Sequence, residues 1–195
     1  ASGITSIPVR KKPIVTIIPT GTELVSPGSH LEPGNIIEFN SLMIAAQIEE
    51  WGGTPIRHPI VPDILEDIRD ATLKALGNSD LVILNAGSSA GSEDYTAQVV
   101  SEVGELLVHG IAVRPGHPVV LGKGQNTPII GAPGYPVSCI LTMDIIAKPL
   151  VSHLLGIIPQ SRTMLKASMS RKVLSPMGED EFLRVKVGKV GSRFI

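Results

Sequence analysis

The sequence predicts an α/β domain in three layers, with a mostly parallel β-sheet between two layers of helices. Strand-like and helix-like segments alternate as far as about Gly156. The strand-like runs are continuously apolar, which is typical of parallel strands that helices cover on both faces. Gly-rich loops follow several of these runs. Because ligands bind at the carboxyl ends of the strands in such folds, these loops are the expected functional site.

Each predicted strand is a short apolar or β-branched run between Pro, Gly or Asn residues. The clearest is "IVTII" at residues 14–18, which Pro and Gly bound on its two sides. We expect strands within residues 14–18, 54–61, 80–87, 105–113, 117–124 and 127–134.

Four other segments carry apolar residues at helical spacing, together with residues that begin and end helices. Asn40 or Ser41 is expected to cap the first helix and Asp63 the second. The last helix is expected to be disturbed at Pro149, because proline has no N–H to donate within a helix. The helices are expected within residues 40–52, 63–77, 94–104 and 135–156.

The chain changes character after Ile158. Polar and apolar residues alternate in "SRTMLKASMSRKVLSPMGEDEFLRVKVGKV", which indicates antiparallel β structure. We therefore divide the chain into a linker at 1–12, an α/β domain at 13–158 and an incomplete β domain at 159–195. The first residues lack an initiator Met and the last carry no terminating signal, so we expect a fragment of a longer protein.

The composition argues against several classes of function. The net charge is −1 and aromatic residues make up 3% of the 195 residues, so a nucleic-acid partner is not expected. Cys139 is the only cysteine, so one chain cannot build a disulfide framework or a zinc cluster, and a cytoplasmic setting is expected. No uninterrupted apolar run approaches the ~20 residues of a membrane span, so no membrane partner is expected.

Three loops that follow predicted strands form the candidate site: "PTGTEL" (19–24), "NAGSSAGSEDYT" (85–96) and "GAPGYPVS" (131–138). Glycines let backbone N–H groups approach a ligand, and the helix after the third loop adds about half a positive charge at its N-terminus. This pattern indicates phosphate or oxyanion binding. Further hydroxyl donors are Ser88, Ser89 and Ser138. Three carboxylates would repel an anion and are interpreted as ligands of a bridging Mg²⁺: Glu23, Asp94 and Asp63.

Simpler interpretations stand beside this one. A single Gly-rich loop is most often a turn, and Glu23 can be merely solvated. Asp63 and Asp94 stand where helix caps stand, and for Asp63 capping alone is the favoured role. A fourth segment, "VRPGHPVVLG" (113–122), carries Arg114, which suits a bidentate phosphate contact. It also carries His117, which is either a ligand contact or a structural residue.

In this order, the four segments resemble the molybdopterin molybdenumtransferase family, whose members insert molybdenum into molybdopterin. The resemblance covers about residues 12–156, and "SPMGEDEFLRV" (175–185) looks like the start of the family's C-terminal β-barrel. It implies a three-layer fold like that of MoaB and Mog proteins, and a dimer or trimer. It also implies adenylylated molybdopterin and molybdate as substrates, Mg²⁺ as cofactor and AMP as product.

The resemblance also maps onto individual positions. The catalytic set that we expect is Glu23, Asp94, Asp63, Arg114 and His117, with Glu23 and Asp94 as metal ligands. The substrate-binding set that we expect is Thr20, Gly21, Gly87, Ser88, Ser89, Gly91, Pro133, Gly134 and Ser138. The chain departs from the family at His117 and Tyr135, where the family usually has Lys and Asn.

Three alternatives to this function stay open, and the departures at His117 and Tyr135 favour the second of them. One is a molybdopterin adenylyltransferase on the same fold, although such relatives usually lack the β-barrel-like tail. The second is a non-catalytic module that senses pterin or molybdate, and a generic nucleotide-binding domain is the remaining option. In the family, N-terminal domains complete the active site across a dimer. We therefore expect this chain to bind its pterin substrate but to turn it over poorly alone.

Overall fold

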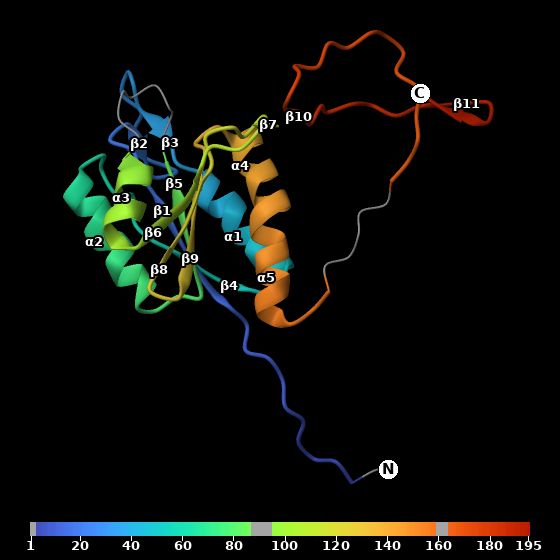
Figure 1. Ribbon diagram of the computed structural model, residues 1–195. Helices are drawn as coiled ribbons and strands as arrows, with labels where there is room; N and C mark the ends of the chain where they lie inside the picture. Colours follow the sequence, from blue (N-terminus) through green and yellow to red (C-terminus); the bar gives the residue numbers. More distant parts are fainter. Residues whose placement is uncertain (1–2, 87–94, 159–163) are drawn as a thin grey trace.

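The computed structural model describes residues 3–86, 95–158 and 164–195. Strands and helices alternate through residues 14–155, as predicted (Figure 1). The helices are α1 (Asn40–Glu50), α2 (Leu65–Leu76), α3 (Tyr95–Val103), α4 (Pro136–Thr142), the π-helical turn η1 (Met143–Ala147) and α5 (Lys148–Leu155). The main sheet consists of β1 (Ile14–Pro19), β4 (Thr54–Arg57), β5 (Leu81–Asn85), β6 (Glu105–His109), β8 (Val120–Gly124) and β9 (Thr127–Ala132). The shorter strands are β2 (Leu24–Val25), β3 (Ile36–Ile37), β7 (Val113–Arg114), β10 (Asp180–Glu181), β11 (Lys189–Val190) and β12 (Arg193–Phe194).

The main sheet has the strand order β4-β1-β5-β9-β8-β6. Its neighbouring strands β4, β1, β5 and β9 pair in parallel, so the predicted mostly parallel sheet is confirmed. The hairpin between β8 and β9 reverses the chain, and β6 then pairs antiparallel to β8. The parallel half of the sheet therefore places the ends of β1, β5 and β9 at one edge.

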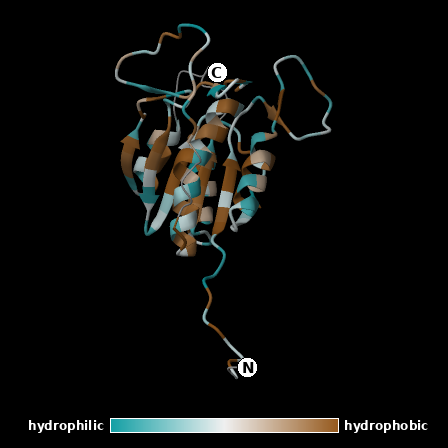
Figure 2. Cartoon of the chain, turned by 90° about the vertical axis from the view of Figure 1, so that its right-hand side faces the viewer, coloured by the Kyte–Doolittle hydropathy of each residue, from teal (hydrophilic) through white to brown (hydrophobic). Residues whose placement is uncertain are grey.

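Helices cover both faces of the sheet, with α2 and α3 on one side and α1 with the last helix on the other (Figure 1). Alternate residues of a strand enter opposite layers, as strand geometry requires. Ile17 and Ile83 pack with α1 and the last helix, whereas Ile18 and Leu84 pack with α2 and α3. All four side chains are fully buried. Apolar residues at consecutive positions therefore serve two cores, and the strands are mostly brown in Figure 2.

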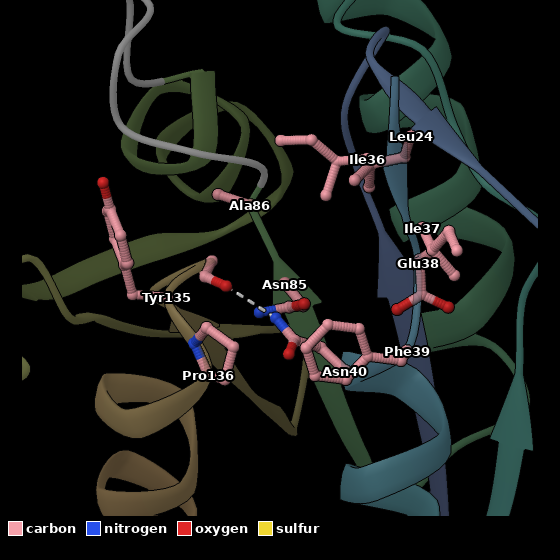
Figure 3. A pocket seen from close by; sticks show the side chains of 11 residues that line it. Leu24, Ile36, Ile37, Glu38, Phe39, Asn40, Asn85, Ala86, Tyr135 and Pro136 are labelled. Carbon is pink, nitrogen blue, oxygen red and sulfur yellow. Dashed lines mark hydrogen bonds between the residues drawn. The ribbon is translucent and has the colours of Figure 1, made fainter. Parts of the chain in front are cut away.

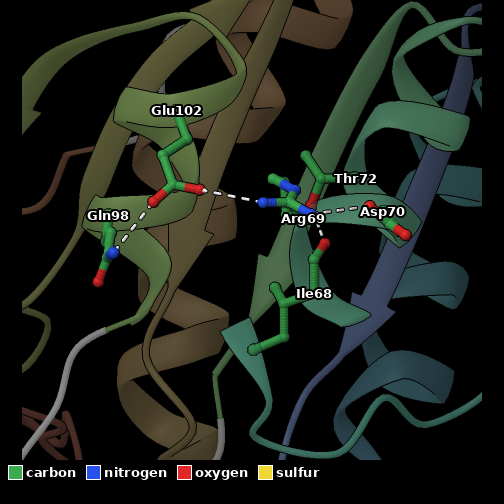
Figure 4. A network of polar contacts seen from close by, with 6 residues as sticks. All are labelled: Ile68, Arg69, Asp70, Thr72, Gln98 and Glu102. Atoms are coloured by element: carbon green, nitrogen blue, oxygen red, sulfur yellow. Dashed lines mark hydrogen bonds and ion pairs between the residues drawn. The ribbon is translucent and has the colours of Figure 1, made fainter. Parts of the chain in front are cut away.

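Polar contacts join α2 to α3 at their outer surface (Figure 4). Nη1 of Arg69 lies 3.8 Å from Oε2 of Glu102, and Nε2 of Gln98 donates to Oε1 of the same Glu102 over 3.0 Å. Because the Arg69 and Glu102 side chains are partly exposed at the surface, their ion pair contributes at most about 1 kcal/mol. The apolar faces of the two helices, rather than this network, therefore hold them on the sheet.

The last helix runs from Pro136 to Leu155 and contains one π-helical turn, Met143–Ala147. The predicted disturbance is therefore present, but it lies directly before Pro149, which has no N–H for the preceding turn. Among the described residues, this helix is long and apolar enough to cross a membrane by length and composition alone. Four residues at a spacing of four are fully buried against the sheet, so core packing accounts for its apolar face: Cys139, Met143, Ala147 and Val151.

The start of α1 corrects the cap prediction. The N-cap position is Phe39, and neither Asn40 nor Ser41 makes a side-chain cap hydrogen bond there. Instead, Oε1 of Glu38 accepts a hydrogen bond of 2.7 Å from the backbone N–H of Ser41. This cap could not be predicted from the sequence, because a carboxyl two positions before the helix is not a usual cap residue.

The tail beyond residue 163 forms little regular structure in its described part, and it lies outside the layered body (Figure 1). β11 and β12 form a short antiparallel pair, whereas β10 pairs in parallel with β7 of the α/β body. Its apolar side chains, such as Met177 and Leu174, are mostly exposed. The division into domains at residues 12 and 158 stays a prediction.

Candidate functional site

The carboxyl ends of β1, β5 and β9 meet at one edge of the sheet. Pro19 is paired with Asn85, and Asn85 is paired with Ala132 on its other side. The first and third predicted loops leave the sheet at Pro19 and Ala132, and the second leaves it at Asn85. Their convergence, expected from a parallel sheet, is therefore present in the structure.

A cavity of about 240 Å³ lies at this edge, between the β2–β3 pair and the start of α4 (Figure 3). In Figure 3, Tyr135 stands on one side, Leu24 and Ile36 on the other, and Asn40 and Asn85 at the base. The lining residues are Leu24, Ile36, Ile37, Glu38, Phe39, Asn40, Asn85, Ala86, Gly134, Tyr135 and Pro136. Most of the wall is apolar, and none of these residues is Lys or Arg.

Two asparagine amides hold the loop between β9 and α4. Nδ2 of Asn40 donates to the carbonyl of Gly134 over 2.7 Å, and Nδ2 of Asn85 donates to the carbonyl of Pro133 over 3.1 Å. Both side chains are more than nine-tenths buried. Because only an N–H group can face a carbonyl oxygen, these contacts fix which end of each amide is the oxygen. Oδ1 of Asn40 is buried without a hydrogen-bond partner in the described structure.

Glu38 lies in the same wall and is only 4% exposed. Besides the backbone N–H of Ser41, its carboxyl accepts the Ser41 hydroxyl over 2.6 Å. The Ser41 oxygen in turn accepts Nε of Arg57 over 2.9 Å. A buried carboxyl is therefore held in one orientation by two donors beside the cavity.

The first loop brings Glu23 and Asp63 close to one another. Asp63 does not cap α2, which begins at Leu65 after an N-cap at Ile64 without a side-chain cap bond. Instead, its backbone N–H donates to Oγ1 of Thr22 over 3.1 Å, and its carboxyl accepts the Thr22 N–H over 3.4 Å. Burial raises the pKa of Asp63, the Thr22 hydrogen bond lowers it, and the charge of Glu23 raises it further. Capping as the sole role of Asp63 is therefore wrong.

Thr20 and Gly21 lie in this loop with their backbone N–H groups already engaged. The Thr20 N–H donates to the Asn85 carbonyl over 2.9 Å, and the Gly21 N–H donates to the Val61 carbonyl over 3.0 Å. Gly21 has φ +155°, and a Cβ there would stand 2.7 Å from Cγ of Leu24. The glycine is thus required by the turn itself, and a ligand contact from either residue stays a prediction.

Arg114 and His117 are not among the residues that line the cavity. The Arg114 guanidinium forms an ion pair with Glu179 from the tail, and its carbonyl accepts the Phe182 N–H over 2.7 Å. The His117 side chain is exposed beside Gly110. Their catalytic roles stay predictions, and Arg114 would have to leave Glu179 to contact an anion.

The remaining predicted residues divide into two groups. In the third loop, Gly134 lines the cavity, Pro133 is held through its carbonyl, and Ser138 lies in the first turn of α4. The five residues predicted in the second loop lie outside the described residues: Gly87, Ser88, Ser89, Gly91 and Asp94. Within the described residues, no group of three or more His, Cys, Asp or Glu side chains could hold a metal ion.

Sγ of Cys139 lies 3.7 Å from Nδ2 of Asn85, one of the residues that line the cavity. It is fully buried, and this burial, together with the charge of Glu38, raises its pKa to about 12. The thiol is therefore protonated at neutral pH and unsuited to act as a nucleophile.

Sequence reasoning missed Glu38, Asn40 and Asn85 as site residues. Asn85 carries the clearest signal, because a polar residue ends an otherwise apolar strand directly before a Gly-rich loop. Glu38 and Asn40 stand before a predicted helix start, where capping was the evident interpretation. Glu38 and Asn40 line a cavity because the β2–β3 pair forms its other wall. The residues of β2 and β3 show no periodic pattern from which this pair could be predicted.

These features define a three-layer α/β domain with a mostly apolar cavity at the carboxyl ends of its parallel strands. Residues 16–153 match the model of a family described as a probable molybdopterin binding domain. The chain therefore belongs to this family, as the resemblance of its four loops indicated. The match includes every element of the main sheet except the first two residues of β1.

Curated relatives carry the name molybdopterin molybdenumtransferase. The protein from Bacillus subtilis is 31% identical over 187 residues, which are 95% of this chain and 43% of the relative. Molybdopterin molybdenumtransferase 2 from Mycobacterium tuberculosis is 30% identical over 193 residues, which are 94% of this chain and 47% of the relative. The chain thus spans about half the length of these relatives.

Solved structures agree with this assignment. The molybdopterin biosynthesis moeA protein from Pyrococcus horikoshii OT3 superposes with a TM-score of 0.67 at 27% identity, covering 94% of this chain and 43% of that one. The molybdopterin biosynthesis enzyme MoaB from a Thermus species superposes with a TM-score of 0.59 at 19% identity, covering 74% of this chain and 97% of that one. The second likeness shows the fold alone and confirms the predicted MoaB-like fold class.

Proposed function

We propose that this chain is the substrate-binding domain of a molybdopterin molybdenumtransferase. In the reaction, molybdate reacts with adenylylated molybdopterin, the adenylyl bond is cleaved, AMP leaves and molybdenum passes to the dithiolene. The observation that carries the proposal is the family match over residues 16–153, together with relatives of this name at about 30% identity over nearly the whole chain. The cavity at the carboxyl edge supplies a place for the substrate.

The first loop suits Mg²⁺, which prefers oxygen ligands. Glu23 and Asp63 approach closely enough that the Glu23 charge raises the pKa of Asp63, and a cation between them would relieve that repulsion. Glu23, Asp63 and the predicted ligand Asp94 would hold the ion. When bound, Mg²⁺ would neutralise the charge of the phosphate groups. Glu23 and Asp63 would orient the ion beside the cavity, and the Thr22 hydrogen bonds keep Asp63 in place.

The proposal includes partners. The relatives are about twice as long as this chain, so their other domains, and a second or third copy in a homo-oligomer, are proposed to complete the catalytic site. The setting proposed for this biosynthetic activity is the cytoplasm. No observation of the structure favours the adenylyltransferase or the sensing module over the transferase.

The test is a turnover assay with the 195-residue chain, adenylylated molybdopterin, molybdate and Mg²⁺, with AMP measured by chromatography. We expect binding of adenylylated molybdopterin, with AMP release much slower than that of a full-length relative. Extending the chain to the relatives' length should restore the rate. Failure of the extended protein to release AMP, or adenylylation of free molybdopterin by ATP, would contradict the proposal.

A further inference from the structure

We propose that residues 178–182 of the tail form an autoinhibitory segment, in which Glu179 blocks the binding of a tetrahedral oxyanion at Arg114. The segment and the oxyanion compete for the same guanidinium, so each lowers the affinity of the other. The proposal concerns access to Arg114, which is not among the residues that line the cavity. It takes up the anion contact predicted for Arg114, and it does not rest on the proposed function, because no pterin substrate enters it.

The Glu179 carboxyl faces two N–H groups of the Arg114 side chain. Nη2 of Arg114 donates to Oε1 of Glu179 over 3.4 Å, and Nε of Arg114 forms an ion pair with Oε2 of Glu179. A guanidinium binds a carboxylate or a phosphate through two such parallel contacts. An oxyanion that used the same two N–H groups would therefore have to displace Glu179.

Two backbone hydrogen bonds fix the autoinhibitory segment beside Arg114. β10 pairs in parallel with β7, so that the two short strands lie side by side (Figure 1). The Asp180 N–H donates to the carbonyl of Ala112 over 2.8 Å, and the Phe182 N–H donates to the carbonyl of Arg114 over 2.7 Å. Because these bonds belong to the same chain, Glu179 competes with a free anion as an intramolecular partner, at a high effective concentration.

The charges of the segment strengthen this competition. Glu179, Asp180 and Glu181 bring three carboxylates to one guanidinium, so the docked segment repels an oxyanion from Arg114. Glu181 is the register partner of Arg114, and its Oε2 is buried without a hydrogen-bond partner among the described residues. A buried oxygen in this state is unfavourable, which makes the docked segment easier to release.

Apolar burial adds little to the docking of the segment in the described part of the tail. Met177 is 99% exposed and Phe182 is 41% exposed. β11 and β12 pair with each other rather than with the α/β body. A ligand shifts an equilibrium between two states only by its difference in affinity for them. Here the released state alone offers both N–H groups of Arg114, so an oxyanion favours release.

The test follows phosphate binding to the complete 195-residue chain by nuclear magnetic resonance. The probes are the Nε–H signal of Arg114 and the backbone N–H signal of Gly116, titrated with inorganic phosphate while sodium chloride keeps the ionic strength constant. Glu179→Gln removes the competing charge and keeps the size of the side chain. We expect this variant to bind phosphate about three- to fivefold more tightly, the upper range for a partly exposed ion pair. Equal affinities would overturn the proposal.

Two further variants show whether the gain in affinity acts through Arg114. Asp180→Asn is the matched control, because it removes the same charge from the next residue, whose side chain is exposed. It should change the affinity by about twofold or less, since solvent and salt screen an exposed charge. Arg114→Gln should abolish the response of Gly116, and adding Glu179→Gln should not restore it. A gain that survives the loss of Arg114, or that Asp180→Asn reproduces, would contradict the competition.

A second measurement detects the release of the segment itself. The N–H groups of Asp180 and Phe182 are bonded to the body, so their hydrogen exchange reports whether the segment is docked. Because the coupling of two binding events is reciprocal, phosphate should accelerate exchange at both positions. The Gly188 N–H, which donates to the carbonyl of Ile195 within the tail over 2.7 Å, should exchange at an unchanged rate. Exchange at Asp180 and Phe182 that ignores saturating phosphate would overturn the proposal.

A last comparison identifies the source of the oxyanion. Tighter binding of adenosine monophosphate than of phosphate would assign a phosphate ester, and the reverse would assign a free oxyanion; the gain with Glu179→Gln supports the competition in either case. These measurements use no pterin, so their failure would leave the AMP-release test of the proposed function unaffected. Equally, an extended protein that releases no AMP would leave the competition at Arg114 intact.

Discussion

At the scale of single residues, Asp63 shows how a predicted site residue changes its role once the chain is folded. The sequence places it before a helix, where a cap is expected, but the folded chain joins it to Thr22 and sets it near Glu23. The family resemblance indicated a site role for both carboxylates. The local sequence pattern alone indicated only a solvated Glu23 and a helix cap at Asp63. Their proximity comes from the pairing of Thr20 with Val61, which no local pattern encodes.

We predict that Asp63→Asn stabilises the protein at neutral pH. The pKa of Asp63 is raised above its usual 3.8, so the folded state holds the proton more tightly than the unfolded state does. The free energy of unfolding therefore falls as the pH rises from about 3.8 through the folded-state pKa. An asparagine keeps the hydrogen-bond acceptor and removes this fall.

The measurement is thermal unfolding of both proteins at pH 3 and pH 7. The melting temperature of Asp63→Asn should exceed that of the original protein at pH 7 by a small margin, since the residue is partly solvated, and the margin should vanish at pH 3. If Mg²⁺ binds here, it should raise the melting temperature of the original protein more than that of the variant. A margin that grows toward low pH would show that the sign is wrong.

At the scale of elements, the sequence predicted the six strands of the main sheet and the helices that cover it, because buried parallel strands and amphipathic helices leave strong periodic signals. It missed the cap of α1 and the short β2–β3 pair. Both depend on contacts between residues that have no periodicity of their own, such as Leu24 with Ile36 and Glu38 with Ser41. The cavity is built from these two features, so its polar wall could not be predicted.

The start of α1 yields a prediction about stability. Glu38→Ala removes the acceptor of the Ser41 N–H and hydroxyl in a site that is 4% exposed. Leaving such donors without partners should lower the free energy of unfolding by about 2–3 kcal/mol. Denaturant unfolding checks this, with Glu49→Ala on the exposed face of the same helix as the control. A Glu38→Ala protein as stable as the control would contradict the role of Glu38 as the cap.

At the scale of the whole molecule, the two buried clusters lie entirely between Val15 and Val151. The described part of the tail reaches the body through the two-residue strand β10 and the partly exposed Arg114–Glu179 ion pair, so it adds few contacts to those of the two clusters. The α/β character of the body follows from its sequence pattern. The alternating pattern of the tail predicted more antiparallel β structure than the short β11–β12 pair that its described part contains.

We therefore predict that a chain ending at residue 158 folds on its own. Its melting temperature should lie within a few degrees of that of the 195-residue chain, since the cores are intact and only weak contacts are lost. Circular dichroism with heating makes the comparison. A truncated chain without a cooperative transition would show that the tail belongs to the folding unit, against the predicted domain division.

The most direct test of a substrate site in this cavity is a nuclear magnetic resonance titration of the ¹⁵N-labelled chain with adenylylated molybdopterin, observing the side-chain amides. We predict that the Asn40 and Asn85 signals shift and saturate with one ligand per chain, while the signal of the exposed Asn78, which follows α2, stays unchanged. Saturable binding that leaves Asn40 and Asn85 unmoved, or that shifts only residues around Arg114 and His117, would contradict a substrate site in this cavity.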